Sequence, residues 1–264
     1  MNPPRLARRA FKKYRTEGLR SVIAAVPRQV KQTVQGDRFF RHMTALRYWK
    51  QRRLYDAPAH PYKVIHVDLD DIVYFNEAID TSWGLGIIKG GDWDTEDNCN
   101  PILSTTHYRG FKQRFEEGYD WEDTVYYRQR ENFLSGIETE RLDYIEQLYE
   151  DITQNGYRPN YEAGHDAPDV GGRQSRFRHL HSLEPFVAIG RDGEVYLSEG
   201  FHRLAIAKLA GIEQIPVNVL ARHERWQQQR EEIHERLRAD TYPEENRHLS
   251  HPDLKDVIDE SEPR

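Results

Sequence analysis

The sequence predicts an α+β fold, in which helices flank a small sheet. Three observations support this class. The run "YKVIHVDLDDIVYF" (62–75) starts with the alternation of a half-buried strand. Two apolar runs, "EPFVAIG" and "EVYLS", flank Arg191-Asp192-Gly193, and an Asp-Gly pair between such runs indicates a β-hairpin. Residues 140–157 and the residues after Gly200 instead place apolar side chains at helical spacing.

The elements follow in order along the chain. Residues 76–136 are less regular, with a helix predicted over 109–118. The segment "ETERLDYIEQLYEDITQNGY" predicts a helix that ends before Gly156. After a glycine-rich loop (164–175) comes the hairpin, and then a helix that stops at Gly211. A strand is expected over residues 215–220, and a polar helix follows it over 223–239.

Charge divides the chain into three zones. Of 264 residues, 37% are hydrophobic and 31% are charged, and the formal net charge is −6. Residues 1–56 carry 15 Lys+Arg against 3 Asp+Glu, whereas residues 57–239 have a net charge of −13 and residues 240–264 one of −5. We therefore predict a basic, partly helical arm (1–57), a domain (58–239) with an insertion at about 76–136, and an acidic disordered tail (240–264).

The turn at Glu199-Gly200, where a strand meets a helix, carries the clearest chemical signal. A helix start presents unpaired N–H groups with partial positive charge, and glycine lets a phosphate approach them. An arginine in the first turn, Arg203, adds a bidentate grip on phosphate oxygens. A neighbouring carboxylate, Glu199, is suited to hold Mg²⁺. A glycine turn of this kind also occurs in proteins that bind no ligand.

Further acids follow the first predicted strand. Phosphotransfer needs a base near the acceptor hydroxyl and carboxylates for Mg²⁺. Asp68, Asp70 and Asp71 are candidates for these roles, and Asp70 also for a metal ligand; Glu77 has a weaker claim. The alternative is that Asp70 or Asp71 only caps a turn.

The stretch "GRDGEVYLSEGFHRLAIAKLAGIEQIPVNVL" (190–220) resembles the nucleotide-binding core of the ParB/sulfiredoxin superfamily. ParB-type partition proteins carry "GERRWRAAKLAG" where this chain has "GFHRLAIAKLAG". The resemblance covers residues 183–222 well, 140–157 moderately and 62–73 weakly. It implies a small mixed sheet and contacts of His202 and Arg203 with nucleotide phosphates. We therefore expect a nucleoside di- or triphosphate (ATP, ADP or CTP) with Mg²⁺ as ligands, and Gly200, Phe201, His202 and Arg203 as the residues that bind the nucleotide.

Departures from the family pattern limit what the resemblance implies. Phe201 stands where partition proteins have glutamate and where sulfiredoxins have their reactive cysteine, so sulfiredoxin chemistry is excluded. Ala205 replaces a further arginine of the ParB helix. After residue 222, about 40 residues are too few for an operator-reading domain plus a dimer domain. A free-serine kinase of the superfamily, with a similar turn and an acidic base, is the nearest precedent.

Other chemical candidates have simpler structural interpretations. Asp92-Trp93-Asp94 and Asp120-Trp121-Glu122-Asp123 pair an aromatic ring with acids, which suits sugar or base stacking, but a loop tryptophan is more often a buried anchor. His223, Trp226 and Arg230 share one face of a predicted helix and could shield a nucleotide, but the simpler interpretation is that they pack against the body of the protein. His165, Asp166 and Arg173 lie in the glycine-rich loop and could close on a phosphate, but a flexible surface loop is the simpler interpretation.

Two functions from different classes remain open. The first is Mg²⁺-dependent phosphotransfer to a small molecule, or nucleotide hydrolysis. The alternative is a non-catalytic, nucleotide-switched binding module that the basic arm recruits to DNA, a membrane or a protein partner. A nuclease ranks last. With one cysteine, Cys99, and neither a secretory signal nor an apolar run that could span a membrane, we expect a cytoplasmic protein, or one peripheral at the membrane.

Overall fold

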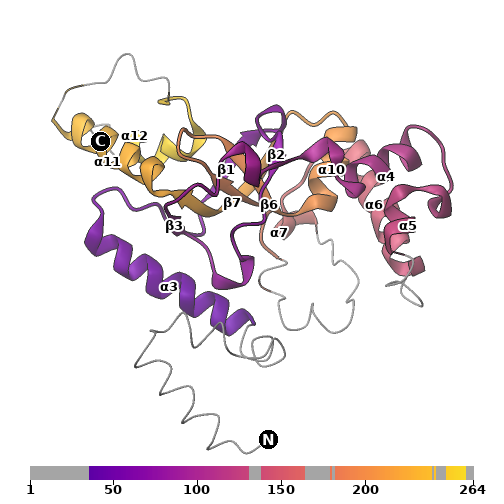
Figure 1. Cartoon of the computed structure of the whole chain (residues 1–264), viewed down its shortest axis with the longest axis horizontal. Helices are drawn as coiled ribbons and strands as arrows, with labels where there is room; N and C mark the ends of the chain where they lie inside the picture. Colours follow the sequence, from indigo (N-terminus) through magenta and orange to yellow (C-terminus); the bar gives the residue numbers. More distant parts are fainter. Residues whose placement is uncertain are drawn as a thin grey trace, which may run out of the picture.

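The computed structural model describes residues 36–130, 138–163, 179, 182–239, 241 and 248–259 of the chain. They form a mixed sheet with flanking helices, which confirms the α+β class (Figure 1). In chain order, the strands and α-helices are α3 (Asp37–Leu54), β1 (Val64–Asp68), β2 (Tyr74–Phe75), β3 (Ile87–Lys89), β4 (Asn100–Pro101), α4 (Thr106–Phe115), α5 (Val125–Arg130), α6 (Glu138–Asn155), α7 (Asn160–Ala163), β5 (Phe186–Ile189), β6 (Val195–Glu199), α10 (Phe201–Leu209), β7 (Gln214–His223), α11 (Glu224–Arg238) and α12 (Lys255–Asp259).

The sheet has the strand order β1-β7-β5-β6-β2-β4, and β3 pairs with β7 beyond the end of β1. The pairs β1–β7, β5–β6 and β2–β4 are antiparallel, and β5–β7, β2–β6 and β3–β7 are parallel. The hairpin forms as predicted, with Gly193 in the left-handed region at φ 93°. The carboxyl ends of β1 and β6 and the amino ends of β5 and β7 therefore lie at one edge of the sheet.

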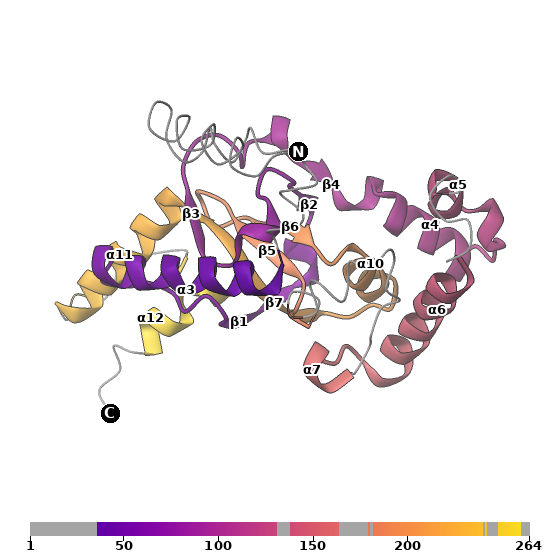
Figure 2. The same ribbon diagram turned by 90° about the horizontal axis from the view of Figure 1, so that it is seen from below.

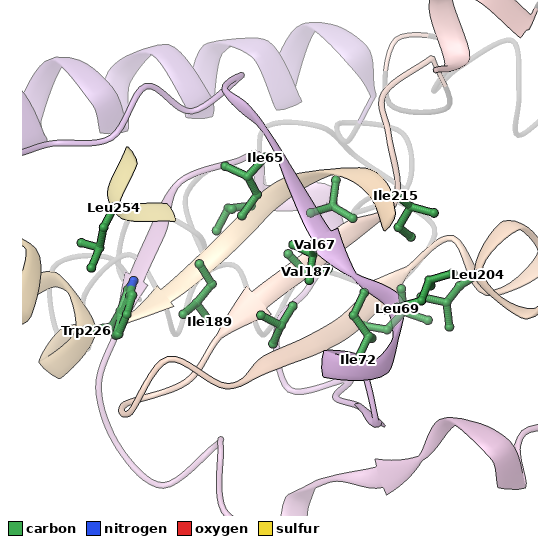
Figure 3. Close-up of a cluster of buried hydrophobic side chains, with 14 of the residues drawn as sticks. Ile65, Val67, Leu69, Ile72, Val187, Ile189, Leu204, Ile215, Trp226 and Leu254 are labelled. Carbon is green, nitrogen blue, oxygen red and sulfur yellow. The ribbon is translucent and has the colours of Figure 1, made fainter. Parts of the chain in front are cut away.

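Buried side chains pack on both faces of the sheet. On one face, Ile65 and Val67 of β1 meet Val187 and Ile189 of β5, and Leu204 of α10 joins them (Figure 3). The other face packs against Phe40 of α3. A third cluster joins α10 to α4, α5 and α6, so that α10 lies between the sheet and these three helices (Figure 2). The sheet and the helical region thus hold α10 from two sides.

The segment 76–136, which we predicted to be an insertion, supplies two short strands of the sheet. Its strand β3 extends the sheet beside β7, and its strand β4 pairs with β2. The helix predicted over 109–118 is α4, which starts three residues earlier. The prediction missed these strands because they have only two or three residues each, too few to show a period.

Helix α3 belongs to the body of the protein, which corrects the predicted arm boundary at residue 57. Phe40 is fully buried, and Thr44 accepts a hydrogen bond from Leu85 N at 3.0 Å. Arg47 donates to Leu85 O at 2.7 Å and Gln51 to Gly86 O at 2.7 Å. Residues 1–35 of the predicted arm lie outside the described residues.

The prediction of a disordered tail is wrong for residues 248–259, which we call the C-terminal segment. It packs onto β7 and α11 with Leu254 fully buried and Val257 3% exposed. The carboxylate of Asp253, also fully buried, accepts hydrogen bonds from Arg222, Arg230 and Trp226. The acidic composition of this segment predicted disorder. The prediction failed because one of its acidic side chains, Asp253, pairs with two buried arginines.

His251 makes the packing of the C-terminal segment sensitive to pH. Its Nδ1 accepts a hydrogen bond from Asp253 N at 3.1 Å, and its Nε2 lies 3.0 Å from Gly193 O, so the neutral ring fits this site. Burial lowers the pKa of His251 in the folded state. Its contribution to stability is therefore complete above the unfolded pKa of about 6.5 and is lost as pH falls from there through the lower folded pKa.

We predict that the wild-type protein loses more unfolding free energy between about pH 7.5 and about pH 5.5 than a His251→Asn variant does. Urea denaturation at the two pH values measures the difference. An equal loss in the two proteins would show that folding does not lower the pKa of His251.

Candidate functional site

The turn between β6 and α10 has the predicted shape. Gly200 adopts φ 99° and ψ 27°, a left-handed conformation that favours glycine. A Cβ atom at this position would lie 2.7 Å from Pro185 Cβ and 3.0 Å from Pro185 Cα. The glycine is thus required by the backbone and by the approach of Pro185, whether or not a ligand binds.

Among the described residues, no side chain caps the amino-terminal end of α10. Gly200 cannot supply a cap, and no described side chain takes its place. In contrast, Thr105 accepts a hydrogen bond from Tyr108 N at the start of α4, and His223 accepts one from Arg225 N at the start of α11. An uncapped start leaves N–H donors and partial positive charge for another acceptor.

Arg203 turns inward from the first turn of α10. Its side chain is 11% exposed, and Nη1 lies 3.7 Å from Glu184 Oε2 and 3.4 Å from the Tyr157 hydroxyl. Glu184, 5% exposed, accepts a hydrogen bond on Oε1 from Asn160 N at 2.6 Å. Burial raises the pKa of Glu184, although Asn160 and Arg203 act in the opposite direction, and burial raises the pKa of Tyr157 to about 12.

Three buried polar atoms at this end of the sheet have no hydrogen-bond partner within the described part of the chain: Glu184 Oε2, Ser198 Oγ and Asn218 Nδ2. Glu184 lies two residues before β5 and donates its N–H to Asn218 Oδ1 at 3.0 Å. Ser198 lies in β6 and Asn218 in β7, the strands on either side of β5. We call Tyr157, Glu184, Ser198, Arg203 and Asn218 the Arg203 cluster. Buried polar atoms without partners are uncommon in native proteins and indicate a water molecule or a ligand.

Phe201 and His202 use their side chains for packing. The Phe201 ring stacks on His107, with ring centroids 5.3 Å apart, and meets Phe75 edge-on. His202 Nε2 lies 2.8 Å from the hydroxyl of Tyr126, which is fully buried. The predicted phosphate contacts at these two positions are therefore confined to the backbone N–H groups.

The structure does not bring the predicted acids together. Glu199 is level with Phe186 and Asn218 across the sheet, whereas Asp68 pairs with Gln214, four residues further along β7. Four residues along β7 correspond to about 13 Å, and β1 and β6 are also three strand spacings of about 4.8 Å apart across the sheet. Asp68 and Glu199 are therefore too far apart to act on one ligand atom. Asp68 is exposed and accepts a hydrogen bond from Gln214 Nε2.

Asp70 and Asp71 are exposed and follow Leu69, whose carbonyl accepts a hydrogen bond from Lys208 near the carboxyl end of α10. The turn at Gly200 lies at the amino end of the same helix, which is roughly 13 Å long. One metal ion bound by both Glu199 and Asp70 does not fit this arrangement. The described residues hold no cluster of three His, Cys, Asp or Glu side chains suited to a metal ion.

Most of the other candidate residues predicted from the sequence have packing or capping roles in the structure. Trp93 and Trp121, 5% and 8% exposed, are buried anchors whose indole N–H groups donate to Lys89 O and to Glu146. Trp226 and Arg230 pack in the interior with the C-terminal segment, as the simpler interpretation predicted. His223 caps α11, and Glu77 is exposed. The loop candidates His165, Asp166 and Arg173 lie outside the described residues.

Sequence reasoning missed Tyr157, Glu184, Ser198 and Asn218. One signal was present, because Asn218 interrupts the apolar run "IPVNVL" and a polar residue within a buried strand needs a partner. Nothing local marks Glu184 or Tyr157, because they reach Arg203 only through the fold.

The fold and the Arg203 cluster define an α+β protein with a candidate anion site at one edge of a mixed sheet. None of the described helices is long and apolar enough to cross a membrane. Comparison with known proteins found no matching family model, no matching curated protein and no matching solved structure. The resemblance to the ParB/sulfiredoxin superfamily thus stays a prediction.

Proposed function

We propose that the protein binds the phosphate groups of a nucleotide, ATP, ADP or CTP, at the amino-terminal end of α10. The observation that carries this proposal is the position of Arg203, whose side chain is 11% exposed and lies in the first turn of a helix that no described side chain caps. Its acidic partner, Glu184, lies at 3.7 Å, which is longer than a charge-assisted hydrogen bond. Glu184 Oε2 has no hydrogen-bond partner within the described part of the chain, and the same is true of Ser198 Oγ and Asn218 Nδ2 on the two strands beside β5.

A phosphate at this position would satisfy several groups at once. Its oxygens would accept hydrogen bonds from the N–H groups of the first turn and from Arg203. Ser198 Oγ and Asn218 Nδ2 offer further donors for phosphate or ribose oxygens. Because Glu184 is an acceptor, it would have to release Arg203, or take up a proton, when an anion binds.

Of the two functions predicted from the sequence, the non-catalytic binding module fits this arrangement better. Phosphotransfer needs a base and metal ligands beside the bound phosphates. Asp68, Asp70 and Asp71 are too far from Gly200 for those roles. Glu199, exposed at the turn, is the predicted acid that remains there, and with the phosphates of a nucleotide it is sufficient to hold Mg²⁺.

We expect that a nucleotide present with Mg²⁺ at roughly one hundred times its Kd raises the melting temperature by about 5–10 °C. The Glu184→Gln/Arg203→Met double variant should bind about 10–100 times more weakly, because the guanidinium is lost without leaving a buried carboxylate unpaired. Glu184→Gln alone should bind at least as tightly as the wild type, because it removes an acid near the phosphates. Differential scanning fluorimetry and calorimetric titration give both results.

Arg225→Met is the matched control, because Arg225 lies in the first turn of α11, which also follows a strand but is capped by His223. It should bind nucleotide like the wild type. The proposal fails if no nucleotide stabilises the wild type, or if the double variant binds unchanged. Release of inorganic phosphate or transfer to a small-molecule acceptor, if abolished by Glu199→Gln, would favour the catalytic function over the binding module.

A further inference from the structure

One face of α3 points away from the body of the protein and carries an unusual mixture of side chains. Arg38, His42, Leu46, Trp49 and Arg53 are all exposed and follow one another at intervals of three or four residues. At this spacing they form one line along the helix, which we call the outer stripe. Leu46 is 59% and Trp49 is 56% exposed, a large apolar area to leave in water.

The opposite face of α3 fixes the direction of the outer stripe. Phe40, Thr44 and Gln51 are buried against the body, and Arg47 is bound to the carbonyls of Trp83 and Leu85. Because these contacts run along most of the helix, α3 cannot rotate to bury Leu46 and Trp49. Figure 1 shows α3 along the border of the described part of the protein.

The charges around the outer stripe have one sign. Arg41, Lys50 and Arg52 flank it and are exposed, which together with Arg38 and Arg53 gives five cationic side chains. The acid of this helix, Asp37, turns inward, and its Oδ2 accepts a hydrogen bond from His179 N at 2.9 Å. The preceding residues 1–35 add nine Lys+Arg against one Glu to the same end of the chain.

The exposed tryptophan is paired with a cation. Arg53 Cζ lies 3.6 Å from the centroid of the Trp49 ring, a cation–π contact that holds the indole at the surface. Helices that lie at the interface between lipid headgroups and acyl chains typically carry tryptophan beside basic residues. The indole is buried in the interface, and the basic side chains contact anionic headgroups.

We propose that the outer stripe docks the protein on the surface of an anionic lipid bilayer, with α3 parallel to the membrane. Leu46 and Trp49 would enter the headgroup region, and the five cationic side chains would contact anionic lipids. Nucleic acid fits the charges but leaves Leu46 without a partner, because phosphate contacts require only cations. This inference does not depend on nucleotide binding at α10.

Sedimentation of the full chain with phosphatidylcholine vesicles, with or without phosphatidylserine, tests the proposal. Binding should require phosphatidylserine, and Leu46→Glu/Trp49→Glu should reduce the partition coefficient on the order of tenfold or more. The matched control is Leu103→Glu/Tyr119→Glu, since Leu103 and Tyr119 are 56% and 45% exposed and lie outside α3. It should bind like the wild type, and unchanged melting temperatures should show that both variants fold.

Tryptophan fluorescence supplies an independent measurement. Trp93, Trp121 and Trp226 are buried and Trp83 is half-buried against Phe39, whereas Trp49 is 56% exposed. A blue shift on addition of anionic vesicles should therefore come mainly from Trp49 and should be largely lost in Trp49→Phe. The proposal is overturned if the protein does not bind the anionic vesicles, or if the double-glutamate variant binds them as the wild type does. Binding of an oligonucleotide that depends on the outer stripe, without vesicle binding, would assign this surface to nucleic acid.

Discussion

Replacement of Asp253 by asparagine is expected to lower the free energy of unfolding by about 3–5 kcal/mol. The carboxylate is fully buried and accepts hydrogen bonds from two arginines, Arg222 at 2.8 Å and Arg230 at 3.3 Å. Burial by itself would raise the pKa of Asp253, but the two arginines lower it, and the net pKa lies below its ordinary value. The asparagine variant keeps the shape of the side chain but leaves two buried guanidinium groups with too little negative charge.

Urea denaturation of the full chain at neutral pH measures this loss. Asp259→Asn is the matched control, because Asp259 is an exposed aspartate at the end of α12 in the same C-terminal segment. Its unfolding free energy should stay within about 0.5 kcal/mol of the wild type. If Asp253→Asn were as stable as this control, the buried ion pairs with Arg222 and Arg230 would contribute little to the stability of the fold.

Replacement of Gly200 by alanine is expected to cost about 2–3 kcal/mol of stability and to weaken nucleotide binding. Two effects add at this position. At φ 99° an L-residue is strained, and the new Cβ would lie within 2.7 Å of Pro185, at the start of β5. The contact is relieved when the start of α10 moves away from Pro185, and we expect this movement to displace Arg203 from the Arg203 cluster.

Gly211→Ala separates the two effects. Gly211 also has a positive φ, 67°, but a Cβ there has no heavy atom within 4 Å, so this variant should lose only about 1 kcal/mol. Denaturation compares the two variants, and calorimetric titration compares their nucleotide affinity. Equal stability losses, or full nucleotide affinity in Gly200→Ala, would show that the close contact with Pro185 does not position the site.

Much of the local structure was predictable from the sequence. The alternation around Ile65 and Val67 predicted β1, and the structure buries these two residues and exposes their neighbours. Helix α6 ends at Asn155, before the predicted stop at Gly156, which has a positive φ of 74°. These predictions held because hydrophobic period and glycine chemistry act between residues that are neighbours in the chain.

The candidate site was only partly predictable. The sequence identified Gly200 and Arg203, because a strand-to-helix turn and its first helical residues are adjacent in the chain. It also grouped Glu199 with Asp70, and in the structure these two lie at opposite ends of α10. The sequence pattern showed that acids follow a strand, but it contained no information on the register of β1 against β7, which sets their distance.

By itself, the sequence determined the α+β class, the main helices and strands, and the basic and acidic zones of charge. Only the tertiary structure decided that Glu184 would face Arg203 and that α3 would turn Trp49 outward. It also decided that an acidic terminal segment would supply the buried partner of two arginines. The physical reason is that burial and ion pairing depend on distances between side chains far apart in the chain, and these distances exist only after the sheet has formed and the helices have packed on it.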